Sequence, residues 1–274
     1  DYSLYQNGLF RTYAYPPLFN SANLSIRSFI SRGQEKVIGS RDGLFYINEA
    51  TGMVKSFVKP VLTSDLILTI SFYQGEYYIG TYGGGMMVLN PETLSLKYFS
   101  QSDTELFQKG HIFCVKPDTK GNLWIGTSQG LFNYNGQTKQ IKHFTSANSQ
   151  LLEGNVYEVS FDSTGKGWIA TETGMCIYDP ASQNLRSNVF PEGFVNKDKV
   201  RTIYEDSEHN LYFIREKGSL FTSTLTMDRF YNQSVFSTLP DNSLMAIVED
   251  NQGWLWVGCN DGLLRIKKEG EEYD

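Results

Sequence analysis

The sequence predicts an all-β fold made of repeated units of four short strands. Three observations support this prediction: the composition, a motif that recurs about every 44 residues, and the turn residues that separate short apolar runs. Of the 274 residues, 14% are aromatic, 20% are charged and 25 are glycine. Rings and glycines suit strands joined by tight turns, and this mixture argues against a coiled coil, a helix bundle or a disordered chain.

The recurring motif is an apolar or aromatic triplet that ends in a small residue and precedes a glycine turn. Its clearest copies are Trp124-Ile125-Gly126 and Trp256-Val257-Gly258. Six copies end at positions 39, 80, 126, 170, 214 and 258, so the steps between them are 41, 46, 44, 44 and 44 residues. A near-constant step of this length is typical of a repeat protein with either four strands or two to three helices per unit.

The third unit decides between strands and helices. Its apolar runs span 112–116, 123–127, 131–134 and 140–144, and Gly, Asn and Asp turns separate them. Runs this short predict strands, because a helix needs ten or more residues with a 3.6-residue period. Six such units predict a β-propeller of four-stranded antiparallel blades, in which each blade buries its faces against its neighbours.

The chain ends leave the closure of the propeller open. We expect one propeller domain over residues 1–274, with an N-terminal hairpin over 1–14 and blades at approximately 26–64, 65–110, 111–155, 156–199, 200–242 and 243–267. In one interpretation, the hairpin, with strands at 2–6 and 9–13, completes the sixth blade and closes a six-bladed ring. In the other, this chain is part of a seven-bladed propeller.

Two features of the repeat have structural interpretations. The spacing of Asp118, Gly121 and Trp124 recurs in the fourth and sixth units, and in a degenerate form in the fifth. An Asp side chain can accept backbone N–H bonds in such a turn, and Gly supplies a positive φ. The glycine that ends each triplet fits a place where blades crowd. Ala170 and Ile214 depart from it, and we expect the fifth blade to be splayed or repacked at Ile214.

Charge and composition exclude several classes of function. The net charge is −6, and no basic run supplies the surface that nucleic acid binding requires. No apolar window is long enough for a membrane span. The three cysteines, Cys114, Cys176 and Cys259, show no metal-ligand spacing with each other or with the three histidines, so we expect buried thiols, no metal and no cofactor.

The segment 121–134, with its copies at 253–264 and 165–175, resembles the two-component regulator propeller repeat, and the resemblance extends over nearly the whole chain. It implies the extracytoplasmic sensor region of a Bacteroidetes hybrid two-component system. Such regions usually hold two propellers and a β-sandwich before a membrane helix and a kinase, and many respond to oligosaccharides. The resemblance therefore implies a periplasmic or extracytoplasmic, non-catalytic sensor within a membrane-anchored parent. Its expected partners are an oligosaccharide, a neighbouring propeller or β-sandwich domain, and a second copy of the chain.

In a propeller, the loops from strand two to strand three and the loops between blades share one face, which is the usual ligand site. Polar side chains and one ring on this face suit the hydroxyls and the apolar face of a sugar. The candidates in the first set of loops are Arg41, Asp42, Tyr82, Gln129, Glu172, Arg215, Glu216, Asn260 and Asp261. Those in the second set are Lys109, His111 and Lys199, together with Arg27, Asn155, Arg201 and Asn242.

Two other classes of function compete with a sensor. One is a scaffold that binds proteins on the propeller face. The other is an enzyme that cleaves glycans with paired carboxylates, for which Glu172 and Glu216 stand at equivalent positions of adjacent blades. The sequence contains no Tyr-Glu-Arg set at equivalent positions and only three histidines, so we predict no catalytic residues.

Overall fold

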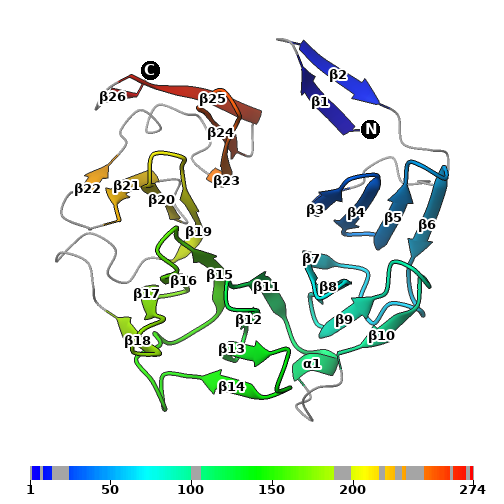
Figure 1. The fold of residues 1–274 in the computed structure, drawn as a ribbon, viewed down its shortest axis with the longest axis horizontal. Helices are drawn as coiled ribbons and strands as arrows, with labels where there is room; N and C mark the ends of the chain where they lie inside the picture. Colours follow the sequence, from blue (N-terminus) through cyan, green and yellow to red (C-terminus); the bar gives the residue numbers. More distant parts are fainter. Residues whose placement is uncertain are drawn as a thin grey trace.

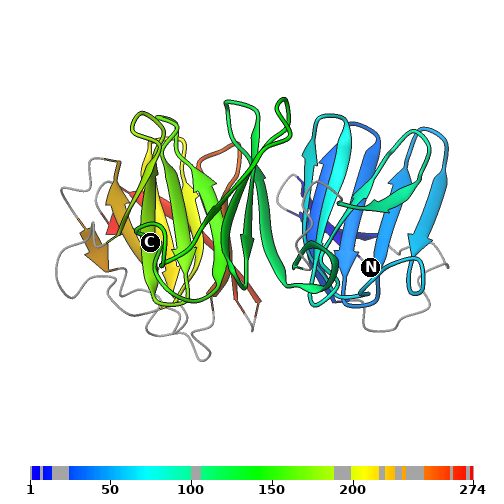
Figure 2. The same cartoon turned by 90° about the horizontal axis from the view of Figure 1, so that it is seen from below.

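Six four-stranded antiparallel sheets and one two-stranded sheet make up the fold. The six larger sheets stand around a ring as the blades of a β-propeller (Figure 1), which confirms the predicted fold class. Seen from the side, the sheets stand next to one another with their connecting loops at both ends (Figure 2). The computed structural model describes residues 2–6, 9–13, 25–99, 106–187, 199–215, 220–225, 230–232, 244–259, 262–269 and 272–273.

The first three blades follow the predicted runs closely. The first contains β3 (Ile26–Arg32), β4 (Glu35–Ser40), β5 (Leu44–Asn48) and β6 (Met53–Phe57). The second contains β7 (Ile67–Tyr73), β8 (Glu76–Thr81), β9 (Met86–Leu89) and β10 (Leu96–Tyr98). A short helix that the sequence did not predict, α1 (Leu106–Lys109), precedes the third blade. That blade contains β11 (Ile112–Pro117), β12 (Asn122–Thr127), β13 (Gly130–Asn135) and β14 (Ile141–Phe144).

The last three blades repeat the same order. The fourth contains β15 (Val156–Phe161), β16 (Gly167–Thr171), β17 (Gly174–Asp179) and β18 (Asn184–Ser187). The fifth contains β19 (Val200–Glu205), β20 (Asn210–Arg215), β21 (Leu220–Thr224) and β22 (Phe230–Asn232). The sixth contains β23 (Leu244–Glu249), β24 (Trp254–Cys259), β25 (Gly262–Glu269) and β26 (Glu272–Tyr273). The first strand of each blade lies innermost and contacts the first strand of the next blade (Figure 1).

The N-terminal hairpin does not complete the sixth blade. Strands β1 (Tyr2–Gln6) and β2 (Leu9–Tyr13) pair with each other as a separate two-stranded sheet. The fourth strand of the sixth blade is β26, which pairs with β25 through Lys268 and Tyr273. The expectation of three strands ending at 267 therefore missed the short β26. Figure 1 places the hairpin between the sixth and first blades.

The aspartate turns are structural, as predicted. In the third blade, one Asp118 oxygen accepts the N–H groups of Lys120 and Asn122 at 2.9 and 2.8 Å. The other accepts the indole N–H of Trp124 at 2.9 Å, a bond that the sequence did not predict. The other pairs of this kind in the described residues are Asp162 with Trp168, Asp206 with Tyr212 and Asp250 with Trp256. Each turn thus also anchors the ring that starts the second strand.

The glycine that ends a triplet lies where two blades crowd. A Cβ added to Gly126 would come within 2.6 Å of Cys114 Sγ and 2.7 Å of the Val156 oxygen. Gly39 and Gly80 are equally confined. Ile214, which replaces this glycine in the fifth blade, is fully buried in the apolar cluster between the fifth and sixth blades.

The two blades at the ends of the series expose apolar side chains that are buried in the others. Leu263 of the sixth blade is 53% exposed, whereas Leu131 at the same position of the third blade is 0% exposed. Phe29 of the first blade is 54% exposed, whereas Val115 at its position in the third blade is 1% exposed. No four-stranded sheet of the described chain covers these two faces, which flank the hairpin in Figure 1.

Candidate ligand-binding site

The innermost strand of each blade contains a bulge with one extra residue. In the third blade, Ile112 pairs with Thr127 and Cys114 pairs with Gly126, so Phe113 is the extra residue. A bulge bends its strand and re-aims a side chain. Phe113 is partly exposed between two buried neighbours. The extra residues of the six blades are Arg27, Leu68, Phe113, Tyr157, Arg201 and Met245.

Four rings from the second, third and fourth blades form a continuous strip. The ring centroids of Tyr82 and His111 lie 4.0 Å apart with an interplanar angle of 30°. His111 lies 6.1 Å from Phe113, and Phe113 lies 5.0 Å from Tyr157. We call these four residues the aromatic strip. The Lys199 ammonium extends it to the fifth blade, 4.4 Å from the centre of the Tyr157 ring.

The loop after β8 holds Tyr82 firmly while its ring stays accessible. The Tyr82 N–H donates to the Leu66 oxygen at 2.9 Å, and its carbonyl accepts the Ser64 hydroxyl at 2.8 Å. Gly85, at a φ of 71°, brings this loop against α1, where a Cβ would lie 2.1 Å from the Phe107 oxygen. The Tyr82 side chain is 51% exposed. The backbone is therefore preorganised and the ring remains free to contact a ligand.

Polar groups surround the strip. The Asn155 side-chain amide donates to the Tyr157 hydroxyl at 2.9 Å, and the Asn155 N–H donates to Glu172 Oε2 at 3.3 Å. The buried His111 Nδ1 has no hydrogen-bond partner within the described residues. The strip therefore lies beside an amide, a carboxylate and the Lys199 ammonium group.

Only part of the predicted face converges on this strip. Tyr82, His111, Glu172 and Lys199 do so, together with Asn155. The remaining described candidates have other settings: Arg41 and Asp42 lie exposed in the first blade, Lys109 ends α1, Arg215 ends β20, and the Gln129 carbonyl bonds His143 Nε2. Glu216, Asn242, Asn260 and Asp261 lie outside the described residues.

The sequence reasoning missed Phe113 and Tyr157, although a signal was present. In an unbroken strand, side chains on one face recur every two residues. Here apolar residues that face the same neighbouring blade are three apart, as in Ile112 and Val115. The additional residue indicates a bulge. The same spacing occurs in the first strand of every unit.

The described residues also show the state of the cysteines and of possible metal ligands. Within the described ranges, no three His, Cys, Asp or Glu side chains group as metal ligands, and no helix has the length and apolar character of a membrane span. Cys114 and Cys176 are buried free thiols, as expected, whereas Cys259 is partly exposed. Burial raises the pKa of the Cys176 thiol to about 11, so it stays protonated at neutral pH.

Two solved structures share the fold at low sequence identity. The chain is 22% identical to the extracellular domain of BT3049 from B. thetaiotaomicron, described as a hybrid two component system, with a TM-score of 0.56. This match covers 96% of this chain and 41% of that chain. The chain is 14% identical to PorZ, a surface component of the type-IX secretion system of Porphyromonas gingivalis, with a TM-score of 0.69. This second match covers 88% of this chain and 38% of PorZ. The chain thus spans about two fifths of each.

A family model identifies the repeat itself. The model described as "Two component regulator propeller" matches residues 107–129 and 238–261, which include Gly126 and Gly258. No curated protein matches the chain. The matched segments are the third and sixth copies of the 44-residue repeat, and all six copies form blades. The family model thus matches two of the six repeat copies, which together make up less than half of the chain.

Proposed function

We propose that this chain is a non-catalytic, ligand-sensing propeller of an extracytoplasmic two-component signalling protein. The ligand is an oligosaccharide that binds along the aromatic strip, and a kinase region outside this chain responds to it. Two segments that match the two component regulator propeller model and the likeness to the extracellular domain of BT3049 support the signalling role. The aromatic strip is the observation that carries the choice of ligand.

The strip has the chemistry that sugar recognition needs. A pyranose ring has an apolar C–H face and a rim of hydroxyls, so a site for it combines accessible rings with convergent polar groups. Tyr82 offers a half-exposed ring at one end of the strip, and Asn155 and Glu172 offer donors and an acceptor at the Tyr157 end. The strip passes across three blades, which suits an extended chain of sugars more than a single one.

Signalling also requires that the ligand distinguish two arrangements of the parent protein. A ligand that binds both arrangements equally shifts neither population. The partner that moves is a neighbouring propeller, a β-sandwich domain or a second protomer. In the parent protein, we therefore expect an oligosaccharide that binds the strip to change the kinase autophosphorylation rate, and the Tyr82→Ala variant to lose that response.

Calorimetric titration with a panel of xylo-, manno-, arabino- and chondroitin-derived oligosaccharides tests the binding step. For an oligosaccharide that binds, Tyr82→Ala should weaken affinity about tenfold or more, which corresponds to the loss of roughly 1.4 kcal/mol of contact. Tyr98→Ala is the matched control, because Tyr98 is a 50% exposed tyrosine on the outer strand β10. It should bind as the unsubstituted protein does.

Three results would count against the proposal. Absence of binding across the panel favours a protein-binding scaffold. If Tyr82→Ala and Tyr98→Ala weaken oligosaccharide affinity equally, the strip is not the binding site. Shortened or rearranged oligosaccharides after prolonged incubation would indicate an enzyme.

A further inference from the structure

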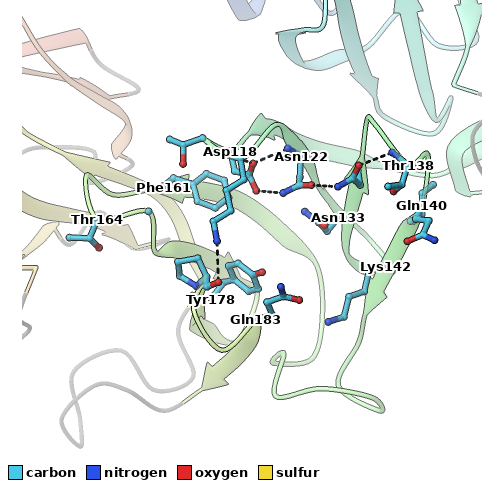
Figure 3. A pocket seen from close by; sticks show the side chains of 16 residues that line it. Asp118, Asn122, Asn133, Thr138, Gln140, Lys142, Phe161, Thr164, Tyr178 and Gln183 are labelled. Atoms are coloured by element: carbon cyan, nitrogen blue, oxygen red, sulfur yellow. Dashed lines mark hydrogen bonds between the residues drawn. The ribbon is translucent and has the colours of Figure 1, made fainter.

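A second hollow lies on the opposite face of the propeller, between the third and fourth blades. It has a volume of about 520 Å³, within the size range of small-molecule sites. The turns from strand one to strand two and from strand three to strand four border it, whereas the aromatic strip lies at the other end of the blades. Figure 3 shows Asn133, Lys142 and Gln183 around the space beside Tyr178.

Asn133 has a buried amide group without a partner. It pairs with Trp124 in the sheet, and the equivalent residues are Tyr46, Val88 and Ile177 in the first, second and fourth blades and Thr222 and Arg265 in the fifth and sixth. The three apolar side chains are 1%, 2% and 7% exposed. The Asn133 Nδ2 atom is buried and has no hydrogen-bond partner within the described residues. A buried donor without an acceptor costs stability, so this amide indicates a missing acceptor.

An amide network fixes the wall beside Asn133. The Asn135 amide donates to Asn122 Oδ1 at 3.0 Å, and the Asn122 amide donates to Asp118 Oδ2 at 2.8 Å. Asp118 also accepts two backbone N–H groups and the Trp124 indole. It is the only carboxylate among the residues that line the hollow. Its oxygens are thus already bonded, and the amides are held in fixed positions.

Two lysines make the hollow positive. The Lys142 ammonium lies 4.6 Å from the centre of the Phe144 ring. The Lys120 ammonium donates to the Pro180 carbonyl at 3.2 Å. Neither has a carboxylate partner in the part of the chain that the structure describes. With Asp118 as the carboxylate among the described lining residues, the two lysines give the hollow a formal charge of +1, which favours an anionic ligand.

The fourth blade supplies an aromatic wall. The Tyr178 ring centroid lies 4.5 Å from that of Trp124, and the Phe161 ring lies 5.9 Å from it. Contact with the buried Trp124 holds both rings in place.

We propose that this hollow binds a sugar acid, that is, a polyhydroxylated ring with a carboxylate. The lysines take the carboxylate, Asn133 and its neighbouring amides take the hydroxyls, and the rings contact the C–H face.

The proposal is independent of the strip, and ligand-observed NMR titration tests it. The probes are glucuronate and galacturonate, with glucose and acetate as partial mimics. We expect saturable binding of at least one sugar acid, and affinities at least about tenfold weaker for glucose, which lacks the charge, and for acetate, which lacks the hydroxyls. Equal binding of acetate, or no binding of either sugar acid, overturns the proposal.

Two variants locate the site. Asn133→Val restores the residue type of Val88 and should raise the melting temperature while it weakens sugar-acid binding at least about tenfold. Lys142→Gln should weaken binding similarly. Lys55→Gln is the matched control, because Lys55 has the equivalent place in the first blade, 5.3 Å from the Phe57 ring. Sugar-acid binding that survives both Asn133→Val and Lys142→Gln refutes the assignment, as does an equal loss in Lys55→Gln.

Discussion

Alanine at Gly126 and at Gly258 should have opposite effects on stability, although the two glycines occupy the same repeat position. Both sit in the second strand of a blade, on β12 and β24. A Cβ at residue 126 would lie 2.6 Å from Cys114 Sγ, 2.7 Å from the Val156 oxygen and 3.0 Å from Val156 Cγ1. Among the described residues, a Cβ at residue 258 would meet only the Ala246 Cβ, at 4.0 Å.

The magnitudes follow from these contacts. At residue 126 one of the obstacles is a backbone oxygen of the next blade, so the interface itself must open by several tenths of an ångström. Overpacking of this kind costs about 1–3 kcal/mol. At residue 258 the methyl group meets no obstacle in the part of the chain that the structure describes, and the loss of unfolded-state freedom stabilises the protein by about 0.4–1 kcal/mol.

Urea unfolding followed by circular dichroism measures both effects. We expect the midpoint to fall for Gly126→Ala and to stay or rise for Gly258→Ala, with unchanged slopes. In a protein of this size each kcal/mol corresponds to roughly 2–4 °C in melting temperature. Equal destabilisation by both variants, or a larger loss for Gly258→Ala, would show that crowding by the next blade does not explain the glycine.

Three further predictions use other parts of the repeat. Leu131→Ala should destabilise by about 2–5 kcal/mol and Leu263→Ala by less than about 1 kcal/mol in the same unfolding assay, because the first side chain is 0% and the second 53% exposed; equal losses would contradict this. Asp162→Ala leaves the buried Trp168 indole N–H unsatisfied and should cost about 1–3 kcal/mol, visible as a lower melting temperature; an unchanged value would show the turn bond to be dispensable. Burial raises the pKa of Cys176 from 9.0 to about 11, so its stabilising effect is complete below pH 9 and is lost as pH rises through 11. When the pH rises through this range, the free energy of unfolding of Cys176→Ala should therefore fall by about 2–3 kcal/mol less than that of the unsubstituted protein. If the free energies of unfolding of the two proteins change with pH in parallel, the pKa shift is refuted.

Much of the fold could be predicted because its signals are local. The strands of the third blade, the N-terminal hairpin and the aspartate turns follow from short runs and turn residues, which act within a few positions. The two short elements that were missed have weak local signals. Strand β26 has two residues, and α1 has four.

The candidate sites depend more on packing between blades. Tyr82 and His111 were predicted on one face, but their stacking requires the second and third blades to stand side by side. Phe113 and Tyr157 enter the strip only through bulges. The unpartnered amide of Asn133 carries no sequence signal, because whether an amide is satisfied depends on neighbours distant in the chain.

The sequence by itself determined the repeat, the four-stranded unit and the turn chemistry, because each is encoded within about 44 residues. Only the tertiary structure decided which copies of one motif behave alike. Gly126 and Gly258 end the similar triplets Trp-Ile-Gly and Trp-Val-Gly, yet among the described residues the first is crowded and the second is open. Leu131 and Leu263 differ in the same way. The physical reason is that a blade is buried by the blade beside it, and the identity of that neighbour is a property of the ring.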